Sequence, residues 1–131
     1  MDASSTKTKY QAYLDCLNER DWNNLYKYVA NSVTHNDKTM TCKQYGQMVE
    51  HFTNIAPDHH FEIKQIVLQA DTLAVIIQLT STPEKEFFGC QPNGKTLRFE
   101  EYCWYWIDDE GKIIRVKSLV DVDAIRAQLD E

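Results

Sequence analysis

The chain has 131 residues, of which 43% are apolar and 26% are charged, and its net charge is −6. This length suits one domain with a single core, and the composition excludes a largely disordered chain. Lys and Arg do not gather into a basic stripe, so nucleic acid is not an expected partner. No apolar run approaches the about 20 residues that span a bilayer, so we expect a cytoplasmic protein without a membrane partner.

Two helices are predicted near the N-terminus. Apolar residues recur at helical spacing from Tyr10 to Leu17, which predicts an amphipathic helix that ends near Arg20. Asp21 is typical of an N-cap, and a second short helix is predicted from it to Val29. The first six residues are expected to be frayed, and the chain as a whole, 1–131, to form one domain.

A brief strand and a third helix follow. Residues 32–36 predict a strand or an extended turn that ends in the turn-forming pair Asn36-Asp37. Thr41 with Gln44 three residues later matches a capping box. The apolar positions behind it predict a helix that ends before Pro57.

The rest of the chain changes to a strand pattern. Four segments rich in β-branched and aromatic residues are separated by turn residues, namely 60–70, 73–82, 95–107 and 112–121. Their order predicts an antiparallel meander, with a longer loop at 83–94.

The first long strand changes its pattern of alternation midway. Phe61 and Ile63 share one parity, whereas Ile66 and Leu68 share the other, which predicts a bulge that bends the sheet. A last helix is predicted at 122–129. Helices followed by antiparallel strands favour an α+β fold, with helices on one face and a concave surface open to a ligand.

Several local strings carry a resemblance to a known family. They are Asp21-Trp22, Val33-Thr34-His35-Asn36, 57–61 (PDHHF), Phe88-Gly89, 92–95 (PNGK), Phe99-Glu100-Glu101, Gly111-Lys112-Ile113 and Val120-Asp121. In this order and spacing the chain resembles the SnoaL-like polyketide cyclases of the nuclear transport factor two-like superfamily, over nearly its whole length.

The resemblance implies a cone-shaped α+β barrel of cystatin-like type, in which a curved antiparallel sheet wraps around the N-terminal helices. It also implies a homodimer through the outer sheet face, a role in secondary metabolism, and acid/base chemistry without metal or cofactor. The acid/base residue of the family is an aspartate at the end of the last strand, which is Asp121 here. Bacterial members tend to carry His and Trp where this chain has Cys103 and Lys117, and the PDHHF and FEE strings are closer to fungal members.

From the sequence alone, Asp121 can be interpreted in two ways. Strand alternation puts it on one face with Lys117 and Leu119, so it could exchange a proton in an apolar pocket. It also directly precedes the last helix and could serve as its N-cap. The two readings do not exclude each other.

The strand at 95–107 carries two alternating sets of side chains, and one of them faces the pocket. The resemblance favours the set that contains Glu101, which leaves an aromatic stripe of Tyr102, Trp104 and Trp106 at a subunit interface, but the reverse remains open. The predicted ligand-binding residues are Phe52, Met48, Phe88, Phe99, Cys103, Tyr105, Lys117 and Leu119.

Histidines supply the remaining acid/base candidates. His35 matches the family's histidine before the third helix, and His60 begins the first long strand; we retain both and set aside His51 and His59. No two histidines have the spacing of a metal motif, and the four cysteines form no CxxC pair. Neither a metal nor a cofactor is therefore expected.

These features favour a cofactor-independent cyclase or isomerase that acts on a small hydrophobic polyketide- or terpenoid-like intermediate. Asp121 would move the proton, assisted by His35, His60 or Glu101. The alternative is a non-catalytic ligand-binding or dimeric interaction protein of the same fold. Dehydration or hydrolysis in the same pocket would use similar groups.

Overall fold

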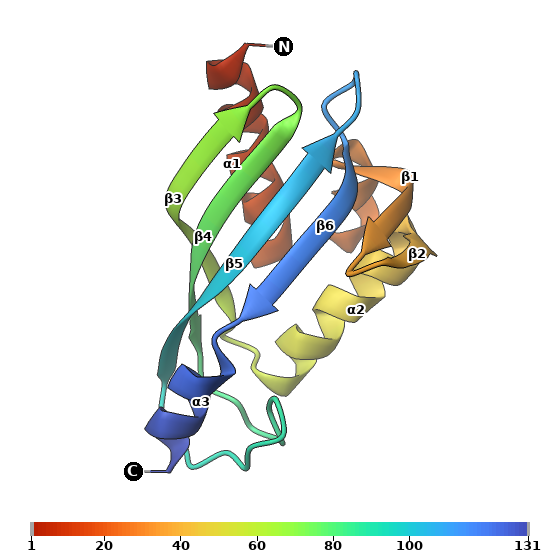
Figure 1. Cartoon of the computed structure of the whole chain (residues 1–131). Helices are drawn as coiled ribbons and strands as arrows, with labels where there is room; N and C mark the ends of the chain where they lie inside the picture. Colours follow the sequence, from red (N-terminus) through yellow and green to blue (C-terminus); the bar gives the residue numbers. More distant parts are fainter. Residues whose placement is uncertain (1, 131) are drawn as a thin grey trace.

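The computed structural model describes residues 2–130, which form a mixed α+β fold (Figure 1). The elements are α1 (Ala3–Asn18), the 3₁₀ helix η1 (Trp22–Lys27), β1 (Val29–His35), β2 (Lys38–Thr41), α2 (Cys42–Ile55), β3 (His60–Gln69), β4 (Thr72–Ser81), β5 (Leu97–Ile107), β6 (Ile113–Val120) and α3 (Val122–Leu129). One sheet contains six strands in the order β2-β1-β6-β5-β4-β3. Neighbouring strands are antiparallel except β1 and β6, which run parallel.

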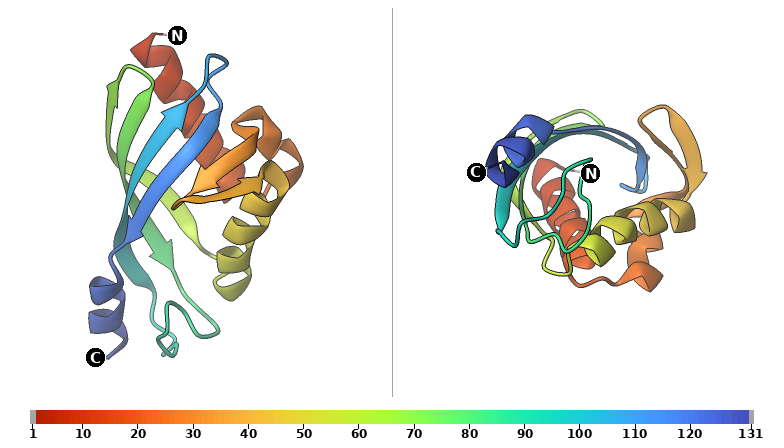
Figure 2. Two further views of the ribbon diagram at one scale, coloured as in Figure 1. Left: turned by 45° about the vertical axis from the view of Figure 1, so that its right-hand side comes forward. Right: turned by 90° about the horizontal axis from the view of Figure 1, so that it is seen from below.

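The sheet curves around the N-terminal helices without closing. Figure 2 shows α1 and α2 on its concave side in the view from below. The register of β3 against β4 shifts between Ile63 and Gln65, which is the predicted bulge and bends the sheet at this edge. The predicted α+β fold, with a curved sheet wrapped around the helices, is confirmed.

The core fills the space between the helices and the concave face. Alternate residues of β4, from Leu73 to Ser81, are buried, and α1 buries Tyr10, Tyr13 and Leu14 against the sheet side. Removal of these apolar surfaces from water is the main force that holds the helices in the curve of the sheet. Within residues 2–130, no helix has the length and apolar character needed to cross a membrane.

Local signals in the sequence place the start of α2 correctly. Thr41 Oγ1 accepts a hydrogen bond from Gln44 N at 3.1 Å, and Thr41 N donates to Gln44 Oε1 at 2.9 Å, so the predicted capping box is present. Asn36 and Asp37 have φ values of 46° and 70°, which join β1 to β2 in a tight hairpin. The strand predicted at 32–36 is part of β1, whereas β2 was not predicted.

Two N-terminal predictions differ from the structure. Residues 3–6 belong to α1 rather than to a frayed end, because Asp2 accepts a hydrogen bond from Ser5 N at 2.7 Å and caps the helix; Met1 lies outside the described residues. The second helix is a 3₁₀ helix that stops at Lys27. Asp21 precedes it but makes no side-chain cap, and Val29 already belongs to β1.

Candidate functional site

A cavity of about 390 Å³ lies between the concave face of the sheet and the helices. Its volume is within the range of small-molecule pockets, roughly 300–1,000 Å³. Met48 and Phe52 of α2 and Phe88 of the β4–β5 loop supply apolar wall. Phe88 stacks on Phe52 with ring centroids 5.2 Å apart. An apolar lining of this kind suits an organic ligand.

Strand β5 separates the cavity from the outer surface. Glu101, Cys103 and Tyr105 line the cavity, whereas Tyr102 and Trp104 are 39% and 49% exposed on the other face. The face that the resemblance favoured is therefore the inner one. The predicted ligand residues Phe52, Met48, Phe88, Cys103 and Tyr105 all line the cavity, and Leu119, which is 70% exposed, borders it.

A polar cluster is assembled where β1 lies beside β6. His35 ends β1 and pairs with Val116, so its ring reaches Ser118, with 3.3 Å between His35 Nε2 and Ser118 Oγ. Asn36 fixes Ser118 from the backbone, because its side chain accepts from Ser118 N at 2.8 Å and donates to Ser118 O at 3.2 Å. Ser118 also contacts the carboxyl of Glu101 on β5. Three strands thus bring His35, Ser118 and Glu101 together.

Burial sets the proton affinities of this cluster. It raises the pKa of Glu101, and hydrogen bonds from Cys103 and Ser118 offset part of this rise. Burial also lowers the pKa of His35. Both shifts favour the uncharged form, so the carboxylate of Glu101 is a stronger base than an exposed carboxylate would be. The pKa of the Cys103 thiol is raised by burial, which disfavours a thiolate nucleophile.

Three tyrosines, Tyr13, Tyr45 and Tyr105, also line the cavity, and Tyr10 lies behind them in the core. Tyr13 and Tyr45 share a hydrogen bond of 2.6 Å between their hydroxyls, and Tyr10 donates to Tyr105 at 2.9 Å. Burial raises the pKa of all four phenols. They remain neutral hydrogen-bonding groups. In the sequence, helical spacing was the only signal from Tyr10, Tyr13 and Tyr45, so none of them was predicted as a site residue.

His59 is a cavity residue that the sequence analysis set aside. It is 4% exposed, lines the cavity, and has its Nδ1 3.0 Å from Ser81 Oγ. Burial, reinforced by the charge of Arg20, lowers the pKa of His59 to about 4. The sequence did hold a signal for His59, which lies two residues before the apolar Phe61, the spacing of side chains on one face of an extended chain. In the structure His59 and Phe61 are buried, whereas His60 between them is exposed.

Four predicted site residues lie elsewhere. His60 is exposed, and Lys117 lies on the outer face, where it forms an ion pair with Asp37 at 2.6 Å. Phe99 is buried but packs on Phe87 and Phe88 rather than lining the cavity. We therefore do not carry these three into the functional proposal.

Asp121 is the fourth. Its carboxylate accepts a hydrogen bond from Ala124 N at 3.1 Å and caps α3, and Asp121 is not among the residues that line the cavity. Its backbone N donates to Glu100 O, which continues the outer-face register of Leu119 and Tyr102. The capping interpretation accounts for this position.

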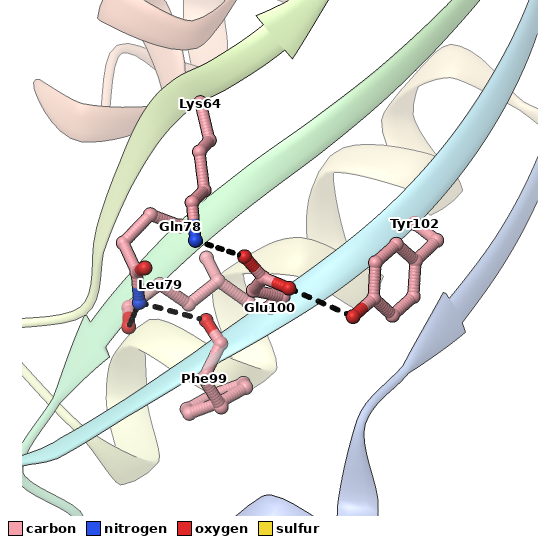
Figure 3. Close-up of polar contacts among 6 residues, drawn as sticks. All are labelled: Lys64, Gln78, Leu79, Phe99, Glu100 and Tyr102. Atoms are coloured by element: carbon pink, nitrogen blue, oxygen red, sulfur yellow. Dashed lines mark hydrogen bonds and ion pairs between the residues drawn. The ribbon is translucent and has the colours of Figure 1, made fainter.

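The outer face of β5 has its own polar contacts (Figure 3). Glu100 accepts hydrogen bonds from Lys64 Nζ and, at 2.8 Å, from the Tyr102 hydroxyl. The hydrogen bond from Lys64 is the main reason why the pKa of Glu100 is lowered. On neither face do the described residues, 2–130, bring together three His, Cys, Asp or Glu side chains that could hold a metal ion.

Comparison with known proteins places this architecture in a family. The model of the SnoaL-like polyketide cyclase family matches residues 7–129. A SnoaL-like polyketide cyclase from Agrobacterium tumefaciens is 32% identical, with 95% of this chain and 97% of that chain covered and a TM-score of 0.90. No curated protein matches the chain.

Two more distant structures share the fold. TsrD from Streptomyces laurentii is 14% identical, with 98% of this chain and 97% of that chain covered and a TM-score of 0.87. IdmH from Streptomyces antibioticus is 17% identical, with 96% and 99% covered and a TM-score of 0.84. On the strength of the family model and the Agrobacterium relative, this chain belongs to the SnoaL-like polyketide cyclase family.

Proposed function

We propose that this protein is a cyclase or isomerase that moves a proton on a small apolar ketone without help from a cofactor. The observation that carries the proposal is the carboxyl of Glu101. It lines an apolar cavity, has a raised pKa, and is connected through Ser118 to His35. Membership of a family described as polyketide cyclases supports a carbonyl-rich substrate such as a polyketide- or terpenoid-like intermediate.

Both reactions begin with the same step. Glu101 as carboxylate removes a proton from the carbon next to a ketone, and the electron pair of the broken C–H bond forms an enolate. Once Glu101 has taken up the proton, the Ser118 hydroxyl no longer needs to donate to a carboxylate and can donate its hydrogen bond to the enolate oxygen.

The second step distinguishes the two outcomes. In a cyclisation, the enolate carbon attacks another carbonyl of the same molecule, and the new alkoxide takes the proton from Glu101. In an isomerisation, Glu101 returns the proton to a different carbon. The aromatic wall would hold the substrate in a folded, reactive shape in either case.

The common first step can be tested without knowledge of the natural substrate. We expect the protein to accelerate deuterium incorporation from D₂O at the carbons beside the carbonyl of 2-tetralone, a bicyclic ketone, as followed by proton NMR. A protein that binds 2-tetralone but leaves its exchange rate at that of buffer would instead support a non-catalytic ligand-binding protein.

We also propose a homodimer through the outer face of the sheet. Tyr102, Trp104 and Leu119 are 39%, 49% and 70% exposed there, and Val67 of β3 is 52% exposed beside a shallow groove of about 490 Å³. Contiguous apolar surface of this kind is typical of an interface. Charges of both signs flank it, which suits contact between two identical copies.

A further inference from the structure

We infer that His59 forms a second polar subsite in the cavity, where its Nε2 shares a hydrogen bond with an oxygen of the ligand. The inference deepens the proposed function and rests on it for the cavity being the ligand site. It starts from a buried imidazole that the proposed chemistry at Glu101 does not use.

The backbone around His59 is fixed from three directions. Arg20 donates from Nη2 to His59 O at 2.6 Å, and His59 N donates to Ala56 O at 2.9 Å. The neighbouring Asp58 accepts a hydrogen bond from Thr82 N at 2.7 Å. The position of this histidine is therefore set before any ligand arrives, as a preorganised binding group requires.

The ring itself is held on one side and open on the other. Ser81 Oγ lies 3.0 Å from Nδ1, and the ring meets Phe61 edge-on with centroids 4.8 Å apart. Nε2 has no hydrogen-bond partner within residues 2–130. No fully buried side-chain nitrogen or oxygen in that range lacks a partner, so Nε2 must border open space, and the space that His59 lines is the cavity.

An open nitrogen on a ring that packs against Phe61 and Phe87 favours a polar ligand atom. The imidazole stays neutral here, so Nε2 either donates one hydrogen bond or accepts one, depending on the tautomer that Ser81 selects. A hydroxyl satisfies either tautomer and a carbonyl satisfies the donor form. A purely apolar ligand would remove water from Nε2 without replacing its hydrogen bond, which costs free energy.

The sheet register places this subsite away from Glu101. Glu101 pairs with Ile77 on β4, and Ser81 lies four residues further along the same strand. At about 3.3 Å per residue, the two points are roughly 13 Å apart along the strand. The subsite therefore selects an elongated apolar molecule with one oxygen function at the Glu101 end and another at the His59 end.

A matched pair of fluorescent probes tests the inference, namely 4,4′-dihydroxystilbene and 4-hydroxystilbene. Both are elongated and aromatic and differ by one terminal hydroxyl. We expect wild-type protein to bind the dihydroxy probe about tenfold more tightly, the size of one good hydrogen bond. His59→Phe should bind the two probes alike, and His59→Gln should recover part of the difference. Equal binding by wild type, or an undiminished difference in His59→Phe, would overturn the subsite.

A measurement on wild-type protein covers the case in which His59→Phe does not fold. With ¹⁵N-labelled histidine, the Nε2 resonance of His59 should move on addition of 4,4′-dihydroxystilbene and should not do so with unsubstituted stilbene, which has no oxygen to share a hydrogen bond. An unmoved resonance with the dihydroxy probe would also overturn the inference. Deuterium exchange into 2-tetralone is a separate assay. If exchange fails while the probes bind as expected, the proposed catalysis is wrong and the His59 subsite stands.

Discussion

Two pairs of adjacent, identical residues, Glu100 with Glu101 and His59 with His60, lie in different surroundings because one member of each pair lines the cavity and the other points away from it. Glu100 and Glu101 are adjacent on β5, yet burial raises the pKa of Glu101 while the hydrogen bond from Lys64 lowers that of Glu100. His59 and His60 are divided in the same way, since His59 lines the cavity and His60 is exposed. Residue type is the same within each pair, so the difference comes from the side to which each side chain points and from what it meets there.

The two faces of β5 differ in how easily a carboxyl can take up a proton. On the outer face, Glu100 is paired with a lysine and stays ionised. On the inner face, Glu101 meets apolar side chains, a serine and a thiol, and its ionised form is disfavoured. A pleated strand thus supplies a structural carboxylate and a candidate catalytic carboxyl from consecutive positions.

The largest expected effect on the exchange rate comes from replacing each of the two glutamates in turn. Glu101→Gln should lower the rate of deuterium incorporation into 2-tetralone by at least about 100-fold, because the amide cannot take up the proton. Glu100→Gln, the matched control, should leave the rate within about twofold. An equal loss of rate in both variants would contradict the proposed difference between the inner and outer carboxyls.

The histidine pair predicts a pH dependence of stability. The pKa of His59 is lowered to about 4 in the folded state from an ordinary 6.5, so below pH 6.5 the unfolded state binds more protons. The contribution of His59 to stability should therefore be lost as pH drops from 6.5 towards 4, and it amounts to about 3 kcal/mol. Urea unfolding across this range should show a shallower fall in His59→Phe and an unchanged fall in His60→Gln. If His60→Gln flattened the profile instead, the assignment of the two faces would be reversed.

The outer face should respond to a charge at its centre. Trp104→Glu is expected to convert a dimer into a monomer in light scattering, because two carboxylates would be buried in the same interface. Tyr26→Glu is the control, since Tyr26 is 57% exposed on η1, outside the sheet. A wild-type protein that is already monomeric would refute the proposed interface.

The smallest effect should come from the cap of α3. Asp121→Ala removes the acceptor for Ala124 N and should cost about 1 kcal/mol of unfolding free energy, with the exchange rate unchanged. Chemical denaturation and the 2-tetralone assay measure the two quantities on the same sample. Loss of exchange with stability intact would return Asp121 to the role of acid/base residue.

Local patterns predicted most of the fold. The capping box at Thr41, the change of parity in β3 and the four long strands are all short-range signals, and each is present in the structure. The hairpin partner β2 is a polar segment of four residues with only one partly buried side chain, Met40, so it carries almost no such signal. The 3₁₀ form of η1 has the same apolar spacing as a short α-helix.

The candidate site was predicted less completely, because its contacts join distant strands. Glu101 and His35 were identified, but Ser118 gave no signal until the parallel pairing of β1 with β6 put it beside His35. Asp121 carried two readings in the sequence, and only the position of α3 favours the cap. His59 could have been found by its parity with Phe61.

The measurement that tests the central claim most directly is a ¹³C NMR titration of the glutamate side-chain carboxyls. Resonances of Glu100 and Glu101 would be assigned by their disappearance in Glu100→Gln and Glu101→Gln. We expect Glu101 to titrate above the ordinary value of 4.5 and Glu100 below it. A midpoint for Glu101 at or below that of Glu100 would contradict the account of an inner carboxyl prepared for proton transfer.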